Sequence, residues 1–191
     1  MSDTGVVAIL LAAGSSTRFG GDKLGAELGA GTVLSAAAKA LAASEPERRA
    51  AVLGEASRQH APLLEALGYD ILINANASEG MGTTLSCGAD WAKSRNADYL
   101  LVALADMPFV TPDHFSDLMQ KARAEPEGLA YSLCSARRTA PACFSARWFG
   151  SLCALQGDAG ARAIIHNAPQ SGAVAAPSRM LADIDFPADL C

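Results

Sequence analysis

The sequence lacks several features that would each point to a particular class of protein. It contains no Cys-x-x-Cys pair and no histidines at zinc-ligand spacing. No apolar run approaches the roughly 18 residues of a membrane span, and no basic stretch followed by an apolar core opens the chain. Charged residues make up only 18% of the sequence, so disorder is not expected. We therefore expect a folded cytoplasmic protein.

Cysteine and histidine are present but scattered. The cysteines are odd in number and mostly have apolar neighbours, which favours buried thiols in a reducing compartment with structural or incidental roles. The histidines are expected to be surface or helix residues rather than metal ligands. These residues are Cys87, Cys134, Cys143, Cys153 and Cys191, and His60, His114 and His166.

Length and charge narrow the class further. At 191 residues, half of them hydrophobic, the chain fits one domain over 1–191 with a substantial core. Its net charge of −5 argues against a general nucleic-acid or anionic-membrane surface, although a local basic pocket remains compatible with it. We expect a small-molecule partner.

Apolar runs alternate with helical patterns along the first two thirds of the chain. Strands are expected over 6–9, 50–53, 70–73 and 99–104, and helices over 33–43, 55–67, 83–95 and from Thr111. This alternation predicts an α/β protein with a doubly wound, mainly parallel sheet flanked by helices. In the less regular last third we expect strands over 129–134 and 141–144 around a turn at 137–139, short helices near 148–155 and 162–165, and a strand-like segment over 181–185.

The loop after the first strand, residues 10–23, reads LLAAGSSTRFGGDK. Its glycines allow close approach of the backbone, and Arg18 and Lys23 place two positive charges nearby, a combination that suits phosphate. The spacing matches neither a P-loop nor Gly-x-Gly-x-x-Gly. An ordinary strand-to-helix turn with solvated Arg and Lys is the alternative.

Leu-Ala-Ala-Gly-x-Ser-x-Arg-x-Gly, followed three residues later by Lys, closely resembles the signature loop of the MobA-like nucleotidyltransferases, in particular the molybdenum cofactor cytidylyltransferases. The resemblance implies a Rossmann-like nucleotidyltransferase fold in which this loop wraps the triphosphate and its first residues lie near the base. Guanylyltransferase relatives usually carry Leu-Ala-Gly-Gly here, so CTP is implied. The implied nucleotide-binding residues are Leu11, Ala12, Ala13, Gly14, Ser15, Ser16, Arg18 and Lys23.

A carboxylate follows the most hydrophobic of the later strands. Asp106, in Leu-Ala-Asp-Met-Pro, comes at the end of that strand and either caps a turn or points into a cleft, where it would suit Mg²⁺. Ala-Asp-Met-Pro is similar to the family's metal-binding strand end. Residues 183–190 look like the family's Asp-Ile-Asp-Thr-Pro-Glu-Asp-Leu ending, with Phe186 in place of Thr, and imply Asp185 as second metal ligand, with Asp183 on the same face. Alternatively, Asp185 and Asp189 only organise a terminal helix.

Two further segments match family patterns. The loop from Asn74 to Thr84, with Glu-Gly-Met in it, implies that Asn74, Gly80 and Thr84 lie near the base or ribose. Gly-Asp-x-Gly-Ala-Arg at 157–162 implies a site for an acceptor phosphate at a helix N-terminus. Capping of a turn or helix is the alternative for both segments. Where relatives usually have Gly shortly before Pro, this chain reads Arg-Thr-Ala-Pro at 138–141.

Together these resemblances imply Mg²⁺-dependent transfer of CMP from CTP to the phosphate of molybdopterin, with release of pyrophosphate. Arg18, Lys23 and Asp106 would be catalytic, Asp106 and Asp185 would hold the metal, and residues 129–191 would form the acceptor-side lobe. A delivery contact with a molybdoenzyme is also implied. The alternatives are transfer to a sugar phosphate or another small phosphorylated acceptor, and a nucleotide-binding cofactor-maturation protein without turnover.

Overall fold

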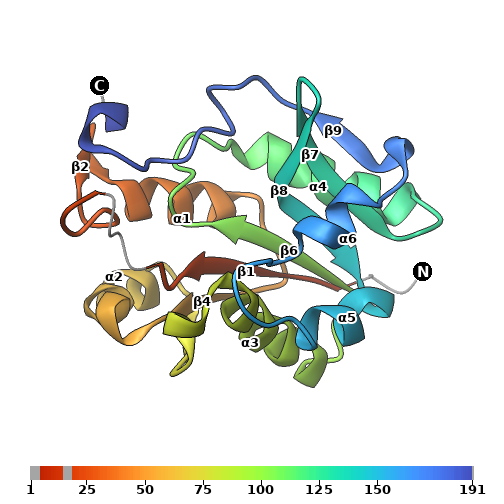
Figure 1. The fold of residues 1–191 in the computed structure, drawn as a ribbon, viewed down its shortest axis with the longest axis horizontal. Coiled ribbons are helices and arrows are strands. Elements are labelled where there is room, and N and C mark those ends of the chain that lie inside the picture. The colour runs from red at the N-terminus through yellow and green to blue at the C-terminus, as the bar shows by residue number, and fades with distance from the viewer. Residues whose placement is uncertain (1–4, 15–18, 191) are drawn as a thin grey trace.

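The computed structural model describes residues 5–14 and 19–190 and has a seven-stranded sheet at its centre. Four adjacent strands are parallel, and the antiparallel strand β8 joins them to the other edge (Figure 1). The mainly parallel sheet and the flanking helices confirm the predicted fold class. In spatial order the strands are β5 (Asp70–Ile73), β4 (Arg48–Leu53), β1 (Val6–Ala12), β6 (Tyr99–Leu104), β8 (Arg137–Ser145), β7 (Leu129–Cys134) and β9 (Ala173–Ala175).

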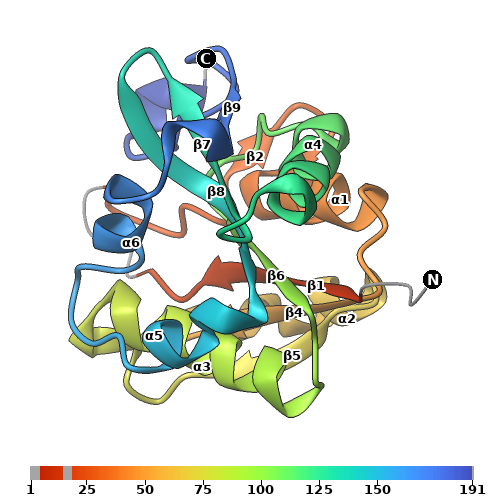
Figure 2. The same cartoon turned by 90° about the vertical axis from the view of Figure 1, so that its right-hand side faces the viewer.

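Helices cover both faces of this sheet. Figures 1 and 2 show α1 (Val33–Ala43) and α4 (Pro112–Ala124) on one side, and α3 (Met81–Ser94) and α5 (Phe149–Cys153) on the other. The short helices α2 (Ala61–Ala66) and α6 (Arg162–His166) pack with the first and the second group respectively. The hairpin of β2 (Glu27–Leu28) and β3 (Gly31–Thr32) precedes α1, and 3₁₀ turns span Glu55–His60, Ala77–Glu79, Ala146–Trp148, Gln170–Gly172 and Pro187–Leu190.

Strand β1 lies at the centre because both of its faces are apolar. All seven of its residues are buried. Alternate side chains point to opposite faces of a strand, so Ala8 and Leu10 join the core under α1 and α4, whereas Val7 and Ile9 join the core under α3. A shift in register would exchange the side chains that pack in the two cores, so the packing on both faces fixes where the loop after Ala12 begins.

Two of the predicted helix starts, those after Thr32 and Thr111, are confirmed by their caps. Thr32 Oγ1 accepts a hydrogen bond from Ser35 N at 3.1 Å, and Ser35 Oγ accepts one from Thr32 N at 2.8 Å, which forms a capping box at the start of α1. Thr111 caps α4 through a single bond, in which its Oγ1 accepts from His114 N, with Pro112 at the first helical position. These side chains satisfy backbone N–H groups that the helices leave without partners.

Two expectations for the last third of the chain are wrong, and one strand there was not predicted. Residues 137–139 belong to β8, and the preceding turn lies at Ser135, which adopts a positive φ of 55°. The segment 181–185 is not a strand, because Ile184 N donates to Asp106 O at 2.9 Å beyond the end of β6 and not within the sheet ladder. Strand β9 was not predicted, since three residues are too few to show alternation.

Candidate active site

The loop over residues 10–23, called the phosphate-like loop below, leaves the sheet at the carboxyl end of β1, beside Asp106 at the end of β6. These strands are parallel neighbours, and their pairing continues past the last pair, Leu11 and Leu104, through Ala105 N, which donates to Leu11 O at 3.0 Å. Asp106 therefore lies beside the residues that open the loop. Ligands bind at such strand ends in open α/β sheets, so topology alone brings these two sequence signals together.

Lys23, Asp106 and Asp185 form a three-residue charge cluster. Lys23 Nζ lies 2.7 Å from Asp106 Oδ2 and 3.5 Å from Asp185 Oδ1. The lysine side chain is only 11% exposed, so water screens these contacts less than on an open surface. Three predicted site residues from distant parts of the chain are thus adjacent. Ser15, Ser16 and Arg18 lie outside the described residues.

The backbone around Asp185 is held by three hydrogen bonds. Ile184 N donates to Asp106 O, and Asp189 Oδ2 accepts hydrogen bonds from Asp185 N at 2.9 Å and from Phe186 N at 2.7 Å. These two N–H donors lower the pKa of Asp189, because they stabilise its charged form. Asp189 therefore organises the terminal turn, as one of the two interpretations predicted, and this leaves the Asp185 side chain directed at Lys23.

The oxygen atoms in this cluster suit a divalent cation. Asp106 and Asp185 each place a carboxylate oxygen within 3.5 Å of the same lysine nitrogen, so their negative charges converge on one point. Within the described ranges no group of three His, Cys, Asp or Glu residues could hold a metal. Mg²⁺ commonly takes only one or two carboxylates and completes its shell with phosphate oxygens and water, so two are enough for a nucleotide-bound ion.

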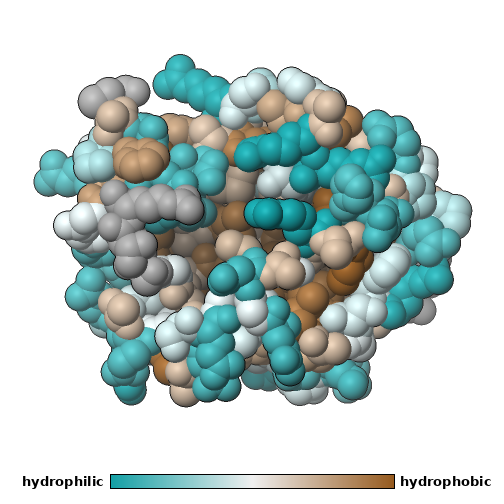
Figure 3. All heavy atoms as spheres, viewed as in Figure 1, coloured by the Kyte–Doolittle hydropathy of each residue, from teal (hydrophilic) through white to brown (hydrophobic). Residues whose placement is uncertain are grey.

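Two cavities meet at Asp106. The larger, of about 670 Å³, lies between the loop after β1 and the start of α3, and the smaller, of about 360 Å³, lies toward β8 and α6. Figure 3 shows hydrophobic atoms within the same face of the molecule, surrounded by hydrophilic ones. The residues that line both cavities are Leu11, Met81, Leu104, Asp106 and Asp158.

Most of the predicted nucleotide-binding residues that the structure describes line the larger cavity. They are Leu11, Ala13, Gly14, Asn74, Gly80 and Thr84. Ala12 does not line it, because its side chain points into the core as alternation along β1 requires. Lys23 does not line the cavity either, but it forms an ion pair with Asp106, which does. The cavity is therefore built by the segments that the sequence singled out.

Asn74 has an internal structural role in this wall. Its Nδ2 donates to Thr83 Oγ1 at 3.0 Å and to Thr84 Oγ1 at 3.2 Å, and its Oδ1 accepts from Asn76 N at 2.9 Å. The side chain is thus engaged at both ends, as the Asn-capped-turn interpretation predicted. It connects the loop after β5 to the first turn of α3.

The glycines at the start of α3 are in close contact with another loop. Gly82 N donates to Gly157 O at 2.6 Å, and a Cβ on Gly82 would lie 2.6 Å from Gln156 O. A Cβ on Gly80, which has φ 117°, would lie 2.4 Å from Asp158 Oδ1. The space that the missing side chains leave is therefore filled by residues 156–158, which close the boundary between the two cavities.

Replacing Gly82 with Ala is expected to destabilise the protein by about 2 kcal/mol, because the new methyl group meets backbone atoms that cannot move independently. Urea unfolding followed by circular dichroism measures this. Gly150→Ala is the matched control: nothing lies within 4 Å of its Cβ position in α5, so it is expected to change stability little or to raise it. Equal midpoints for Gly82→Ala and the wild type would contradict the close contact.

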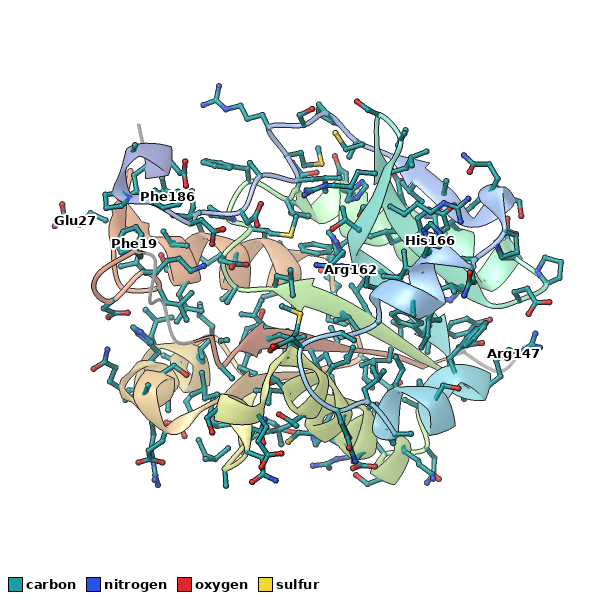
Figure 4. All side chains as sticks on the ribbon, in the orientation of Figure 1. Phe19, Glu27, Arg147, Arg162, His166 and Phe186 are labelled. Carbon is teal, nitrogen blue, oxygen red and sulfur yellow. The ribbon has the colours of Figure 1, made fainter. Side chains whose placement is uncertain are left out.

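The arginines around the smaller cavity differ in whether their guanidinium groups are bonded to other parts of the protein. Arg138 donates to the carbonyls of His166 and Ala168 and to Gln170 Oε1, and its guanidinium lies 5.1 Å from the Tyr131 ring centroid. Arg137 and Arg162 are exposed and have no ion-pair partner in the described part of the chain. Figure 4 labels Arg162 near the middle of the face that holds the cavities. These two arginines, and not Arg138, are available to a ligand.

Replacing Arg138 with Ala is expected to cost about 2 kcal/mol of stability, since it leaves carbonyls at the end of α6 without their charged donor. Thermal unfolding measures the effect. Arg137→Ala, at an exposed neighbouring position, is expected to stay within about 0.5 kcal/mol of the wild type. If both variants unfolded at the same temperature, the structural role of Arg138 would be wrong.

Three of the described cysteines have thiols whose pKa is raised, which disfavours the reactive thiolate. Cys143 is buried, and burial raises its pKa to about 12. Burial is also the main cause that raises the pKa of Cys153 to about 11 and the pKa of Cys87 above its usual value. Cys87, Cys134 and Cys153 are half-buried, so the expectation that the thiols are buried holds fully only for Cys143.

The partners of Asp22 were not predicted from the sequence. His60 Nε2 lies 3.0 Å from Asp22 Oδ1, and Gln59 Nε2 donates to Asp22 Oδ2 at 3.0 Å. Asp22 belongs to the phosphate-like loop, but no periodicity or motif connects it to residues 59 and 60. Only the folded arrangement brings them together.

The profile of the MobA-like NTP transferase domain matches residues 8–173. The chain belongs to the MobA-like NTP transferase family. This match covers most of β1, the strand end at Asp106 and most of the lining of both cavities. The nucleotidyltransferase class is thus established together with the fold.

One relative agrees with this family membership, and two solved structures agree with the fold. Purine catabolism protein PucB of Bacillus subtilis (strain 168) is 31% identical over 193 residues, which cover 95% of this chain and 92% of PucB. Rv0371c from Mycobacterium tuberculosis H37Rv superposes with a TM-score of 0.78 at 24% identity over 97% of this chain and 96% of its own. A nucleotidyl transferase from Methanothermobacter thermautotroptrophicus gives a TM-score of 0.79 at 18% identity over 97% and 94% of the two chains. At these identities the two structures support the fold alone.

Among the helices that the structure describes, none is both long and apolar enough to cross a membrane.

Proposed function

We propose that this member of the family is a Mg²⁺-dependent cytidylyltransferase. It transfers CMP from CTP to the phosphate of molybdopterin and releases pyrophosphate. The acceptor phosphate is the nucleophile, the α-phosphorus of CTP is attacked, and the bond from that phosphorus to the β-phosphate oxygen breaks. A phosphate monoester is already an anion at neutral pH, so no side chain needs to remove a proton.

The two cavities that meet at Asp106 are the observation that supports this reaction most strongly. Group transfer without a covalent enzyme intermediate requires both substrates to be bound at once with their reacting atoms in contact. The larger cavity suits the nucleotide, because most of the described residues that were predicted to bind nucleotide line it. The smaller cavity suits the acceptor, because most of its lining lies within residues 137–185. The wall that they share then marks the place of transfer.

Lys23, Asp106 and Asp185 have the charges that this chemistry needs. In the proposed complex Asp106 and Asp185 hold Mg²⁺ by their carboxylate oxygens. When bound, the ion neutralises phosphate charge and orients the triphosphate. Lys23 turns from the carboxylates to the phosphates and, with Arg18, stabilises the negative charge that develops on pyrophosphate. Manganese is a suitable substitute probe, since Rv0371c has also been solved as a manganese complex.

The acceptor side is proposed to lie in residues 129–191. Its cavity combines apolar side chains such as Phe144 and Leu181 with the exposed guanidinium groups of Arg137 and Arg162. Apolar walls suit a flat heterocycle, and arginine suits phosphate because it can donate two parallel hydrogen bonds. A phosphorylated pterin has both features.

Pyrophosphate release with Mg²⁺ tests this proposal, with CTP and GTP each assayed in the presence and absence of molybdopterin. We expect release that requires molybdopterin and favours CTP. Release with a sugar phosphate but not with molybdopterin would replace the acceptor. Tight CTP binding without release for any acceptor in the panel would favour a non-catalytic maturation protein.

A further inference from the structure

The Asp22 cluster, which consists of Asp22, Gln59 and His60, joins two elements next to Lys23. The 3₁₀ turn Glu55–His60 follows β4, whereas Asp22 immediately precedes the lysine of the charge cluster. Asp22 Oδ1 accepts from Gly25 N at 3.1 Å and lies 3.0 Å from His60 Nε2, and Oδ2 accepts from Gln59 at 3.0 Å. A carboxylate can only accept, so His60 donates through Nε2.

This cluster restrains the backbone on both sides of Lys23. Gly25 N is bonded to the Asp22 side chain, and Ala26 N donates to the carbonyl of Lys23 at 3.2 Å. Asp22 also packs closely on Gly25, since a Cβ there would lie 2.3 Å from Asp22 Oδ2. The turn that carries Lys23 is therefore tied to the 3₁₀ turn by a side chain only one residue away.

The 3₁₀ turn and residues from both described ends of the phosphate-like loop line one small cavity. A cavity of about 220 Å³ is lined by Gly14 and Gly21 from the loop and by Ala56, Gln59 and His60 from the turn. The imidazole is nearly enclosed, with 12% of its side chain exposed, whereas Asp22 is 45% exposed. A histidine that merely covered the surface would not need this orientation.

We propose that His60, acting through Asp22, is a positioning residue that holds Lys23 for the β- and γ-phosphates of the nucleotide. This inference rests on the proposed role of Lys23. It predicts an effect that depends on the number of phosphates. Without the His60 donor the enzyme loses affinity for a nucleoside triphosphate, because Lys23 is less well placed. A nucleoside monophosphate that does not reach Lys23 binds as before. A lysine that is already held in place raises affinity, because binding then costs less conformational entropy in that side chain.

Calorimetric titration with CTP and with CMP, each with Mg²⁺, tests the proposal on four variants. His60→Leu removes the donor and is expected to weaken CTP binding about tenfold, or roughly 1.4 kcal/mol, with CMP affinity unchanged. His60→Gln keeps an N–H donor and is expected to stay within about threefold of the wild type. Gln59→Leu, at an exposed position, removes the second donor and is expected to weaken CTP binding about threefold. His166→Leu, on exposed α6, is the matched control with no expected change.

Lys23→Met, measured alongside, separates the positioning role of His60 from the phosphate role of Lys23. If Lys23→Met weakens CTP but His60→Leu does not, or if His60→Leu weakens CTP and CMP equally, the positioning role is wrong and the proposed function stands. If Lys23→Met leaves CTP affinity unchanged, the phosphate role of Lys23 in the proposed function is what fails. Should His60→Leu not fold, Gln59→Leu decides, and unchanged CTP affinity in that variant overturns the proposal.

Discussion

Replacing Asp106 with Asn is expected to lower kcat for pyrophosphate release by about 10³-fold while the protein stays folded. The substitution keeps the shape of the side chain and an oxygen near Lys23 Nζ, which lies 2.7 Å from Asp106 Oδ2 in the wild type. It removes the charge that a divalent cation needs. Because Asp106 also lines both cavities, loss of this charge acts where the two substrates meet.

Steady-state kinetics over a range of Mg²⁺ concentrations measure the effect of Asp106→Asn. Asp117→Asn, at an exposed position on α4, is the control for a general change of charge and is expected to behave like the wild type. Thermal unfolding of both variants checks that the fold persists. Retained turnover with unchanged Mg²⁺ dependence in Asp106→Asn would refute the assignment.

Replacing Lys23 with Met is expected to have two opposite effects. Affinity for CTP falls by about 10- to 100-fold, since a charge-assisted hydrogen bond to phosphate is lost. Affinity for Mn²⁺ in the absence of nucleotide rises, because the ammonium no longer occupies the point where Asp106 and Asp185 converge. Affinity for a nucleoside without phosphates stays the same.

Electron paramagnetic resonance of free Mn²⁺ and titration with CTP and cytidine measure these effects separately. Lys39→Met, an exposed lysine on α1, is the control. An equal loss of affinity for CTP and cytidine would count against a phosphate role for Lys23. Unchanged or weaker Mn²⁺ binding would show that the lysine does not compete with metal.

The strands that shape the site were predictable because their signals are local. Residues 70–73 and 99–104 form strands with the predicted bounds, and Thr32 caps α1 where expected. Parallel pairing of β1 and β6 then places Asp106 beside the phosphate-like loop, so the position of this part of the site follows from the predicted sheet.

The details that escaped prediction depend on contacts between distant segments. Alternation suggested a strand at 181–185, but Ile184 bonds to Asp106 O instead, and nothing near Ile184 in sequence indicates that partner. The close contacts of Gly80 and Gly82 with residues 156–158 likewise have no signal in the sequence near either glycine. His60 gave no signal as a partner of Asp22, because its role exists only once two loops are folded together.

The hydrogen bond between Ile184 and Asp106 has a consequence for how the protein folds. Ile184 donates to a carbonyl just beyond the end of β6, and that carbonyl is held in position only once β6 has paired with its neighbours in the sheet. The sheet can therefore assemble before the segment that carries Asp185 docks beside Asp106. In refolding experiments the secondary structure is expected to recover before metal binding does, so the last event in folding is the one that completes the active site.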